Sequence, residues 1–129
     1  MKTLLITKTV VEVGAGLALA LFPSIAVSLL LGSPLDVTAT VIGRFAGTAL
    51  LTLGIACWLA RNDAQSPAAA GLIAALLFYD AGIVAVLLFA RLALGLSGIG
   101  LWPGVILHSA LGIWSLLCLG KGPRPALLR

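Results

Sequence analysis

Four long apolar stretches, separated by short breaks, make up most of the chain. None of them alternates apolar and polar residues, as the strands of a membrane barrel would over about ten positions. Each is a continuous run close to the roughly 20 residues that a helix needs to cross the hydrocarbon of a bilayer. The pattern predicts an all-α, four-helix membrane bundle in one domain, with spans over about 3–22, 34–60, 67–94 and 101–119 and a tail over 120–129.

The breaks between these stretches carry residues that end and start helices. Pro23 ends the first helix, and the segment 24–31 that follows is too short to cross. We expect this segment to form a short helix along the outer membrane interface; a re-entrant loop is the alternative. Ser33 and Ser66 each precede a proline, so each is expected to cap the helix that follows, with Asp36 able to bond back to Ser33.

The composition agrees with lipid as the main solvent of the chain. Of the 129 residues, 61% are hydrophobic and only 9% are charged, which leaves too little polar surface for a water-soluble domain. The formal charge of +4 comes from scattered basic residues that form no patch. Nucleic acid is therefore not an expected partner, whereas membrane lipid is.

The positions of the basic residues predict the orientation of the bundle. With four spans, both termini and the middle loop share one side, and the basic residues on this side are Lys2, Lys8, Arg61, Lys121, Arg124 and Arg129. The opposite side has only Arg91. The positive-inside rule then puts both termini in the cytoplasm. The N-terminal segment looks like a signal peptide, but Glu12 inside its apolar part argues against cleavage.

Every predicted span contains one ionisable residue inside its apolar run: Glu12, Arg44, Asp80 and His108. A charge at the bilayer centre costs about 2.5–3.5 kcal/mol on insertion scales, so such residues usually face other helices and pair. At about 1.5 Å of rise per residue, all four lie near the midplane. We therefore expect one polar layer in which Arg44, always charged, pairs with Glu12 or Asp80 and the remaining groups bind a proton.

A purely structural arrangement fits the same residues. Lys8 precedes Glu12 by four positions, so these two can pair along their own helix. Arg44 and Asp80 can then form an ion pair that only fixes how the second and third helices pack. A lone histidine inside a helix bundle is more often a hydrogen-bonded interior residue than a proton relay. The sequence leaves both arrangements open.

The candidate residues suggest binding rather than catalysis. The chain has no nucleophile beside an oriented base, no phosphate-binding loop and no cluster of metal ligands, so an enzyme acting alone is not favoured. Arg44, Tyr79 and His108 are candidate donors to a quinone, a lipid or another small hydrophobic compound held between the helices. The spacing of Gly43 and Gly47 permits close helix approach, either within the bundle or in a homo-oligomer.

Three segments, GRFAGTALLTLGIACWLAR, AAGLIAALLFYDAGIVAVLL and LWPGVILHSALGIWSLLCL, resemble the small four-helix bacterial inner-membrane proteins grouped as DoxX-like. The likeness extends from about Leu4 to Leu119 and rests on pattern: arginine with glycine in the second helix, a polar residue after Tyr79 and a histidine in the fourth helix. It implies an accessory or quinone-associated subunit of a larger complex in the bacterial inner membrane. It transfers no catalytic residue.

The sequence Val11-Glu12-Val13-Gly14 is similar to the first helix of small multidrug resistance transporters. In that family a glutamate within the membrane exchanges protons for cationic drugs. The resemblance implies a proton-coupled transporter as the alternative function. Arg44 and Asp80 depart from the family's pattern, and a fixed cation near the site would oppose cationic cargo.

Overall fold

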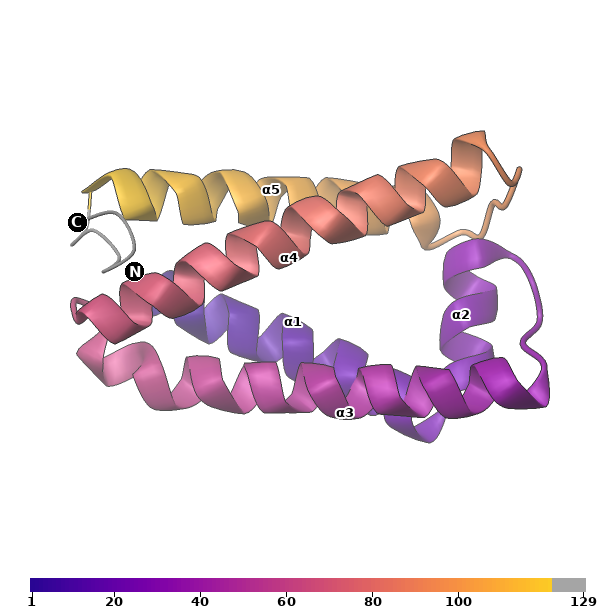
Figure 1. Ribbon diagram of the computed structural model, residues 1–129, viewed down its shortest axis with the longest axis horizontal. Coiled ribbons are helices and arrows are strands. Elements are labelled where there is room, and N and C mark those ends of the chain that lie inside the picture. Colours follow the sequence, from indigo (N-terminus) through magenta and orange to yellow (C-terminus); the bar gives the residue numbers. More distant parts are fainter. Residues whose placement is uncertain (122–129) are drawn as a thin grey trace.

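The computed structural model describes residues 1–121, which are helical apart from the connecting segments. The elements are α1 (Lys2–Leu21), α2 (Pro23–Leu31), α3 (Val37–Ala60), the 3-10 turn η1 (Arg61–Asp63), α4 (Pro67–Leu92) and α5 (Leu101–Lys121). Four helices, α1, α3 extended by η1, α4 and α5, are long and apolar enough to cross a membrane. The predicted all-α, four-helix membrane bundle is confirmed (Figure 1).

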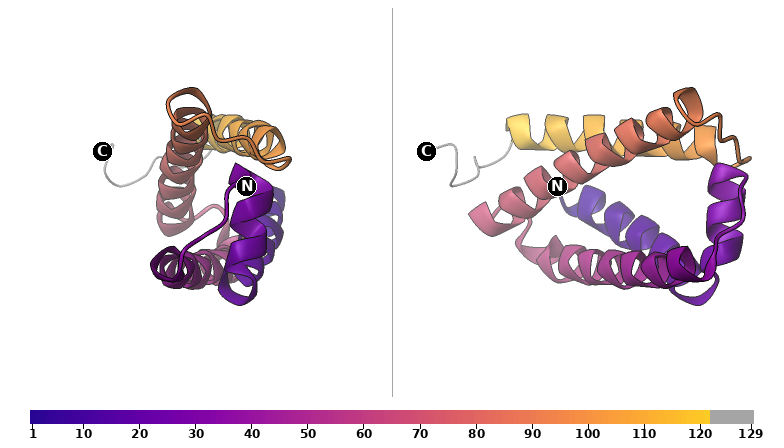
Figure 2. Two further views of the ribbon diagram at one scale, coloured as in Figure 1. Left: turned by 90° about the vertical axis from the view of Figure 1, so that its right-hand side faces the viewer. Right: turned by 45° about the vertical axis from the view of Figure 1, so that its right-hand side comes forward.

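The short helix α2 lies crosswise at one end of the bundle, which agrees with the predicted interfacial segment (Figures 1 and 2). Gly32 ends α2 in the left-handed conformation, with φ 73°. The loop between α4 and α5 is fastened to α2, because the Gly100 amide donates to the Leu29 carbonyl at 2.8 Å. A Cβ on Gly98 would meet the backbone of Leu29 and Leu30, so the loop lies directly against the helix.

Of the two predicted serine caps, one is confirmed and one is wrong. The Ser66 hydroxyl accepts a hydrogen bond from the Ala69 amide at 3.1 Å and so caps α4. At α3 the cap is Asp36, whose Oδ1 accepts from the Ala39 amide at 2.7 Å. Ser33 instead lies in the bend that follows α2. Aspartate caps a helix as well as serine does, so the later residue starts the helix.

The spans are arranged as two helix pairs, α1 with α3 and α4 with α5. Glycines bring the first pair together: a Cβ on Gly16 would lie 2.9 Å from the Gly47 carbonyl oxygen, and one on Gly54 would lie 2.6 Å from Val13 Cγ2. A Cβ on Gly47 would meet the backbone of α1 at Ala20. Because a Cβ at Gly16 or Gly47 would meet the backbone of the other helix, α1 and α3 pack backbone against backbone at these two glycines.

All four spans contribute to the buried apolar core. Its members are Leu4, Leu5, Cys57, Ala64, Ile73, Leu76 and Leu111. Leu4 and Leu5 lie one turn before Lys8 on α1, and Leu76 lies one turn before Asp80 on α4. The core therefore packs against the N-terminal side of the polar residues on α1 and α4 and holds these residues at the same depth along the bundle.

Candidate functional site

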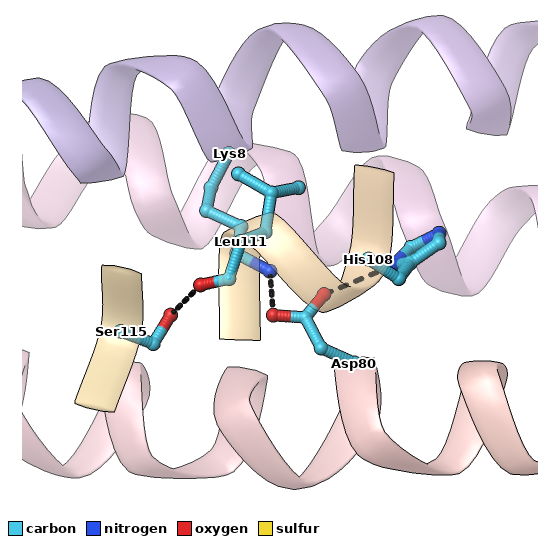
Figure 3. A network of polar contacts seen from close by, with 5 residues as sticks. All are labelled: Lys8, Asp80, His108, Leu111 and Ser115. Carbon is cyan, nitrogen blue, oxygen red and sulfur yellow. Dashed lines mark hydrogen bonds and ion pairs between the residues drawn. The ribbon is translucent and has the colours of Figure 1, made fainter. Parts of the chain in front are cut away.

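Asp80 on α4 is the centre of a polar cluster that joins three spans (Figure 3). Its Oδ2 lies 2.5 Å from Lys8 Nζ on α1, and its Oδ1 lies 2.9 Å from His108 Nδ1 on α5. The side chains of Lys8 and Asp80 are 0% and 1% exposed. Charged groups inside a bilayer usually face the protein interior and pair in this way, which keeps both away from lipid.

Glu12 lies one turn after Lys8 on α1 and is 1% exposed. Lys8 bonds to Asp80 rather than to Glu12, so the pairing along α1 that the sequence allowed is wrong. Oε1 of Glu12 has no hydrogen-bonding partner within residues 1–121, although the charged groups of Lys8 and Asp80 lie near this carboxyl group. Burial without a partner is costly for a carboxylate. Glu12 is therefore the uncompensated acid of the cluster.

Arg44 does not belong to the cluster, and its predicted pairing with Glu12 or Asp80 is wrong. Its side chain is exposed, and Nη1 donates to the carbonyl oxygen of Ala20 at 3.0 Å. Ala20 is in the last turn of α1, where carbonyl groups lack partners within the helix and carry partial negative charge. Arg44 thus provides a hydrogen-bond donor to a carbonyl group at the C-terminal end of α1. Lys8 is the cation that pairs with Asp80.

Tyr79 packs edge-on against His108, with ring centroids 5.7 Å apart and an angle of 78° between the rings. This contact and the bond to Asp80 hold the imidazole from two directions. Of the residues singled out in the sequence, Glu12, Tyr79, Asp80 and His108 are therefore gathered in one region. Lys8 was missed as the partner of Asp80, because its charge was interpreted as a topology signal or as a partner of Glu12 along the same helix.

A groove of about 370 Å³ opens between α4 and α5 beside this cluster. It is lined by Leu77, Asp80, Ala81, Val84, His108, Ser109, Gly112, Ile113 and Leu116. Gly112 contributes no side chain, and a Cβ built there would lie 3.5 Å from Asp80 Cβ. The volume is at the lower end of the range of small-molecule sites, which combine apolar walls with a few polar groups.

Two further hollows of about 280 Å³ each lie away from the cluster. One is bordered by Met1, Trp114 and Lys121 at the end of the bundle, and the other is wholly apolar and lies between α1 and α2. In the described chain, no three His, Cys, Asp or Glu side chains lie together as metal ligands would. Of these three hollows in the described part of the chain, the groove between α4 and α5 reaches the polar cluster.

No protein-family model matches the chain, and no curated protein or solved structure matches it either. The role of this small membrane protein must therefore be inferred from the cluster and the groove themselves.

Proposed function

We propose that the protein is an accessory membrane protein that binds a lipid-soluble molecule with a polar head group, a quinone or a lipid, in the groove between α4 and α5. The observation that carries the proposal is the position of Asp80 and His108 at the wall of a groove whose other lining residues, apart from Ser109, are apolar or glycine. Apolar walls would take up the tail of such a molecule, and the few polar groups would hold its head.

The cluster is accessible from the groove between α4 and α5. This access favours a binding role for the cluster over a purely structural ion pair. An ion pair that only joined helices would need no access from outside the protein. Here the His108 side chain remains 13% exposed, and Ser109 beside it lines the same groove. Gly112 keeps space free next to Asp80, in a position where a larger residue would close the groove.

The test is to identify what co-purifies with the protein after gentle extraction, by mass spectrometry of the bound lipids and quinones. We expect Gly112→Leu to lower the occupancy of the bound molecule by about tenfold, which corresponds to a loss of about 1.4 kcal/mol of binding. Gly82→Leu is the matched control on α4, because a Cβ there meets nothing within 4 Å. If folded Gly112→Leu retains the same ligand at wild-type occupancy, the groove is not the site.

The accessory role is supported by the resemblance to DoxX-like proteins, and it predicts a larger partner complex. Native mass spectrometry of the extracted protein would detect that complex. In a strain that lacks the protein, the amount of the partner complex should fall. Recovery of the protein only as a monomer or homo-oligomer, together with an intact membrane proteome in the deletion strain, would contradict an accessory role.

A proton-coupled transporter is a second candidate, favoured by the buried Glu12, whose Oε1 has no hydrogen-bonding partner within residues 1–121. Arg44, the fixed cation that the sequence placed near Glu12, lies at the end of α1 instead, and Lys8 is paired with Asp80, so the objection to a cationic cargo is weaker. An uncompensated acid of this kind can exchange a proton for a cation. Glu12→Gln would then abolish pH-dependent uptake into proteoliposomes and leave the occupancy of the groove unchanged. Uptake that persists in Glu12→Gln would exclude this mechanism.

We place the protein in the bacterial inner membrane with both termini in the cytoplasm, on the distribution of basic residues. The exposed residues Asn62, in η1, and Ser97, in the segment between α4 and α5, follow spans that run in opposite directions and so lie on opposite sides of the membrane. In intact cells, a membrane-impermeant maleimide should label Ser97→Cys, and it should label Asn62→Cys only after the membrane is permeabilised. The reverse labelling would invert the topology.

A further inference from the structure

We infer that the groove selects ligands whose head group carries a hydroxyl, and that this selection weakens at acid pH, because Asp80 determines which nitrogen of His108 carries the proton. The inference rests on the proposed binding function and specifies its ligand. The ligand class is a hydrogen-bond donor with an apolar tail: a hydroquinone, a phenol or the alcohol group of a lipid.

The first step is the direction of the hydrogen bond between His108 and Asp80. Lys8 Nζ lies 2.5 Å from Asp80 Oδ2, and both side chains are buried. A lysine ammonium group can only donate, and the carboxylate paired with it can only accept. Asp80 Oδ1 therefore accepts from His108, so Nδ1 is the imidazole nitrogen that carries the hydrogen in neutral His108.

The second step concerns the other nitrogen of the same ring. In a neutral imidazole with hydrogen on Nδ1, Nε2 carries a lone pair and accepts. Nε2 is bonded to no other group in residues 1–121, and it is not shut off from the protein surface. His108 lines the groove, so a molecule bound there that reaches Nε2 would meet an acceptor. The edge contact with Tyr79 limits rotation of the ring.

The third step is the discrimination that follows. A hydroxyl group donates a hydrogen bond to Nε2. An ether or carbonyl oxygen has no hydrogen to donate, so its lone pairs face the lone pair of Nε2 and this nitrogen receives no hydrogen bond. One hydrogen bond made or lost between neutral groups changes an equilibrium constant by about tenfold. We therefore expect a hydroxylated ligand to bind about tenfold more tightly than its methyl ether.

The pH dependence follows from protonation of His108. In the imidazolium form both nitrogens donate, so Nε2 then favours a carbonyl group over a hydroxyl. The groups near the ring are Asp80 and Tyr79 on α4, and Lys8 and Glu12 on α1. From α3, Cys57 lies near Glu12 rather than near the ring. The hydrogen bond of Nε2 changes direction when the ring itself gains a proton.

The experiment uses the full chain in lipid nanodiscs and three probes with the same tail: 4-decylphenol, 4-decylanisole and 4-decylbenzaldehyde. At about pH 8 the phenol should bind about tenfold more tightly than the anisole, and at about pH 5 this preference should be lost while the benzaldehyde gains. The chain has a single histidine, so its imidazole ¹⁵N signals need no assignment. These signals should report hydrogen on Nδ1, and the phenol alone should shift the Nε2 resonance.

Two variants separate the inference from the binding function. His108→Gln should bind phenol and anisole equally at every pH, whereas Ser109→Ala, the neighbouring polar residue of the groove, should keep the preference. Equal binding of the two probes to the wild type, with both weakened in Gly112→Leu, would overturn the hydroxyl selection and leave the groove as a binding site. Binding of neither probe would remove the proposed function together with this inference. Hydrogen on Nε2 at neutral pH would overturn the selection even if no variant folds.

Discussion

Helix α1 makes two contacts of opposite kinds. Against α3 it packs through glycines, so that a Cβ on Gly16 or Gly47 would meet the backbone of the partner helix. Toward α4 and α5 it presents Lys8, whose ion pair with Asp80 connects the two helix pairs. The first contact depends on the absence of side chains along much of the helix. The second depends on a few charged atoms.

The difference suggests separate roles for the two contacts. Lipid tails are as apolar as leucine, so helices in a membrane associate through close packing and polar bonds rather than through a hydrophobic driving force. The glycine contact is close packing and has no group that responds to pH. The polar contact can change with protonation, and it borders the groove. We therefore expect α1 and α3 to act as a rigid support and the contact of α1 with α4 and α5 to carry the chemistry.

The largest effect should come from breaking the polar contact on one side only. Lys8→Met leaves the buried Asp80 carboxylate without its cation, and the expected loss is about 3–5 kcal/mol of unfolding free energy. The double variant Lys8→Met/Asp80→Asn removes both charges and should recover a large part of this loss. Unfolding in mixed micelles would measure four proteins: the wild type, Lys8→Met, Asp80→Asn and the double variant. Additive losses in the double variant would mean that the two residues do not form a pair.

The next largest effect should come from the glycine contact. Gly47→Ala places a Cβ against the backbone of α1 at Leu19 and Ala20, where nothing can yield without moving a helix. Overpacking of this kind costs about 1–3 kcal/mol. Gly82→Ala is the control: its Cβ meets nothing within 4 Å, and the better helix propensity of alanine should stabilise the protein by up to about 1 kcal/mol. Equal effects of the two variants would show that α1 and α3 are not in close contact.

The spans and most of the site residues were predictable from local features of the sequence. Uninterrupted apolar runs of membrane length predict the helices, and an ionisable residue inside such a run predicts burial against protein. Asp80 and His108 were found in this way and are bonded to each other. Helix starts were less certain, because Ser33 and Asp36 are both good caps and only the path of the chain after α2 decides between them.

The role of Arg44 could not be predicted, because counting residues gives depth along a helix and not direction around it. Arg44 lies three residues before Gly47 and so faces α1, but it reaches α1 only at Ala20, in the last turn of that helix. The spacing of Lys8 and Glu12, four positions apart, puts both residues on one face of α1, but it suggested only a pair between these two residues. The pairing of Lys8 with Asp80 depends on how the two helix pairs meet, which no local pattern records.

The helix start that was wrongly predicted gives a smaller test. Asp36→Ala removes the side chain that accepts from the Ala39 amide and should cost about 1 kcal/mol of unfolding free energy. Ser33→Ala is the matched control and should change stability little, because Ser33 lies in the bend after α2. The same unfolding measurement applies. A larger loss of stability in Ser33→Ala than in Asp36→Ala would mean that Ser33 caps α3 and that the helix begins earlier in the chain.

The smallest effect is expected at Arg44, and it decides whether this residue belongs to the end of α1 or to the polar contact. Arg44→Gln keeps a donor for the Ala20 carbonyl but removes the charge near the helix end, so the loss should be about 0.3–1 kcal/mol and should shrink as salt is added. The ¹⁵N signals of His108 and the occupancy of the groove should not change. If Arg44 were part of the polar contact, its loss would match that of Lys8→Met, because a buried carboxylate would again be left unpaired. Such a loss would also be insensitive to salt, since buried pairs are screened far less than exposed charges.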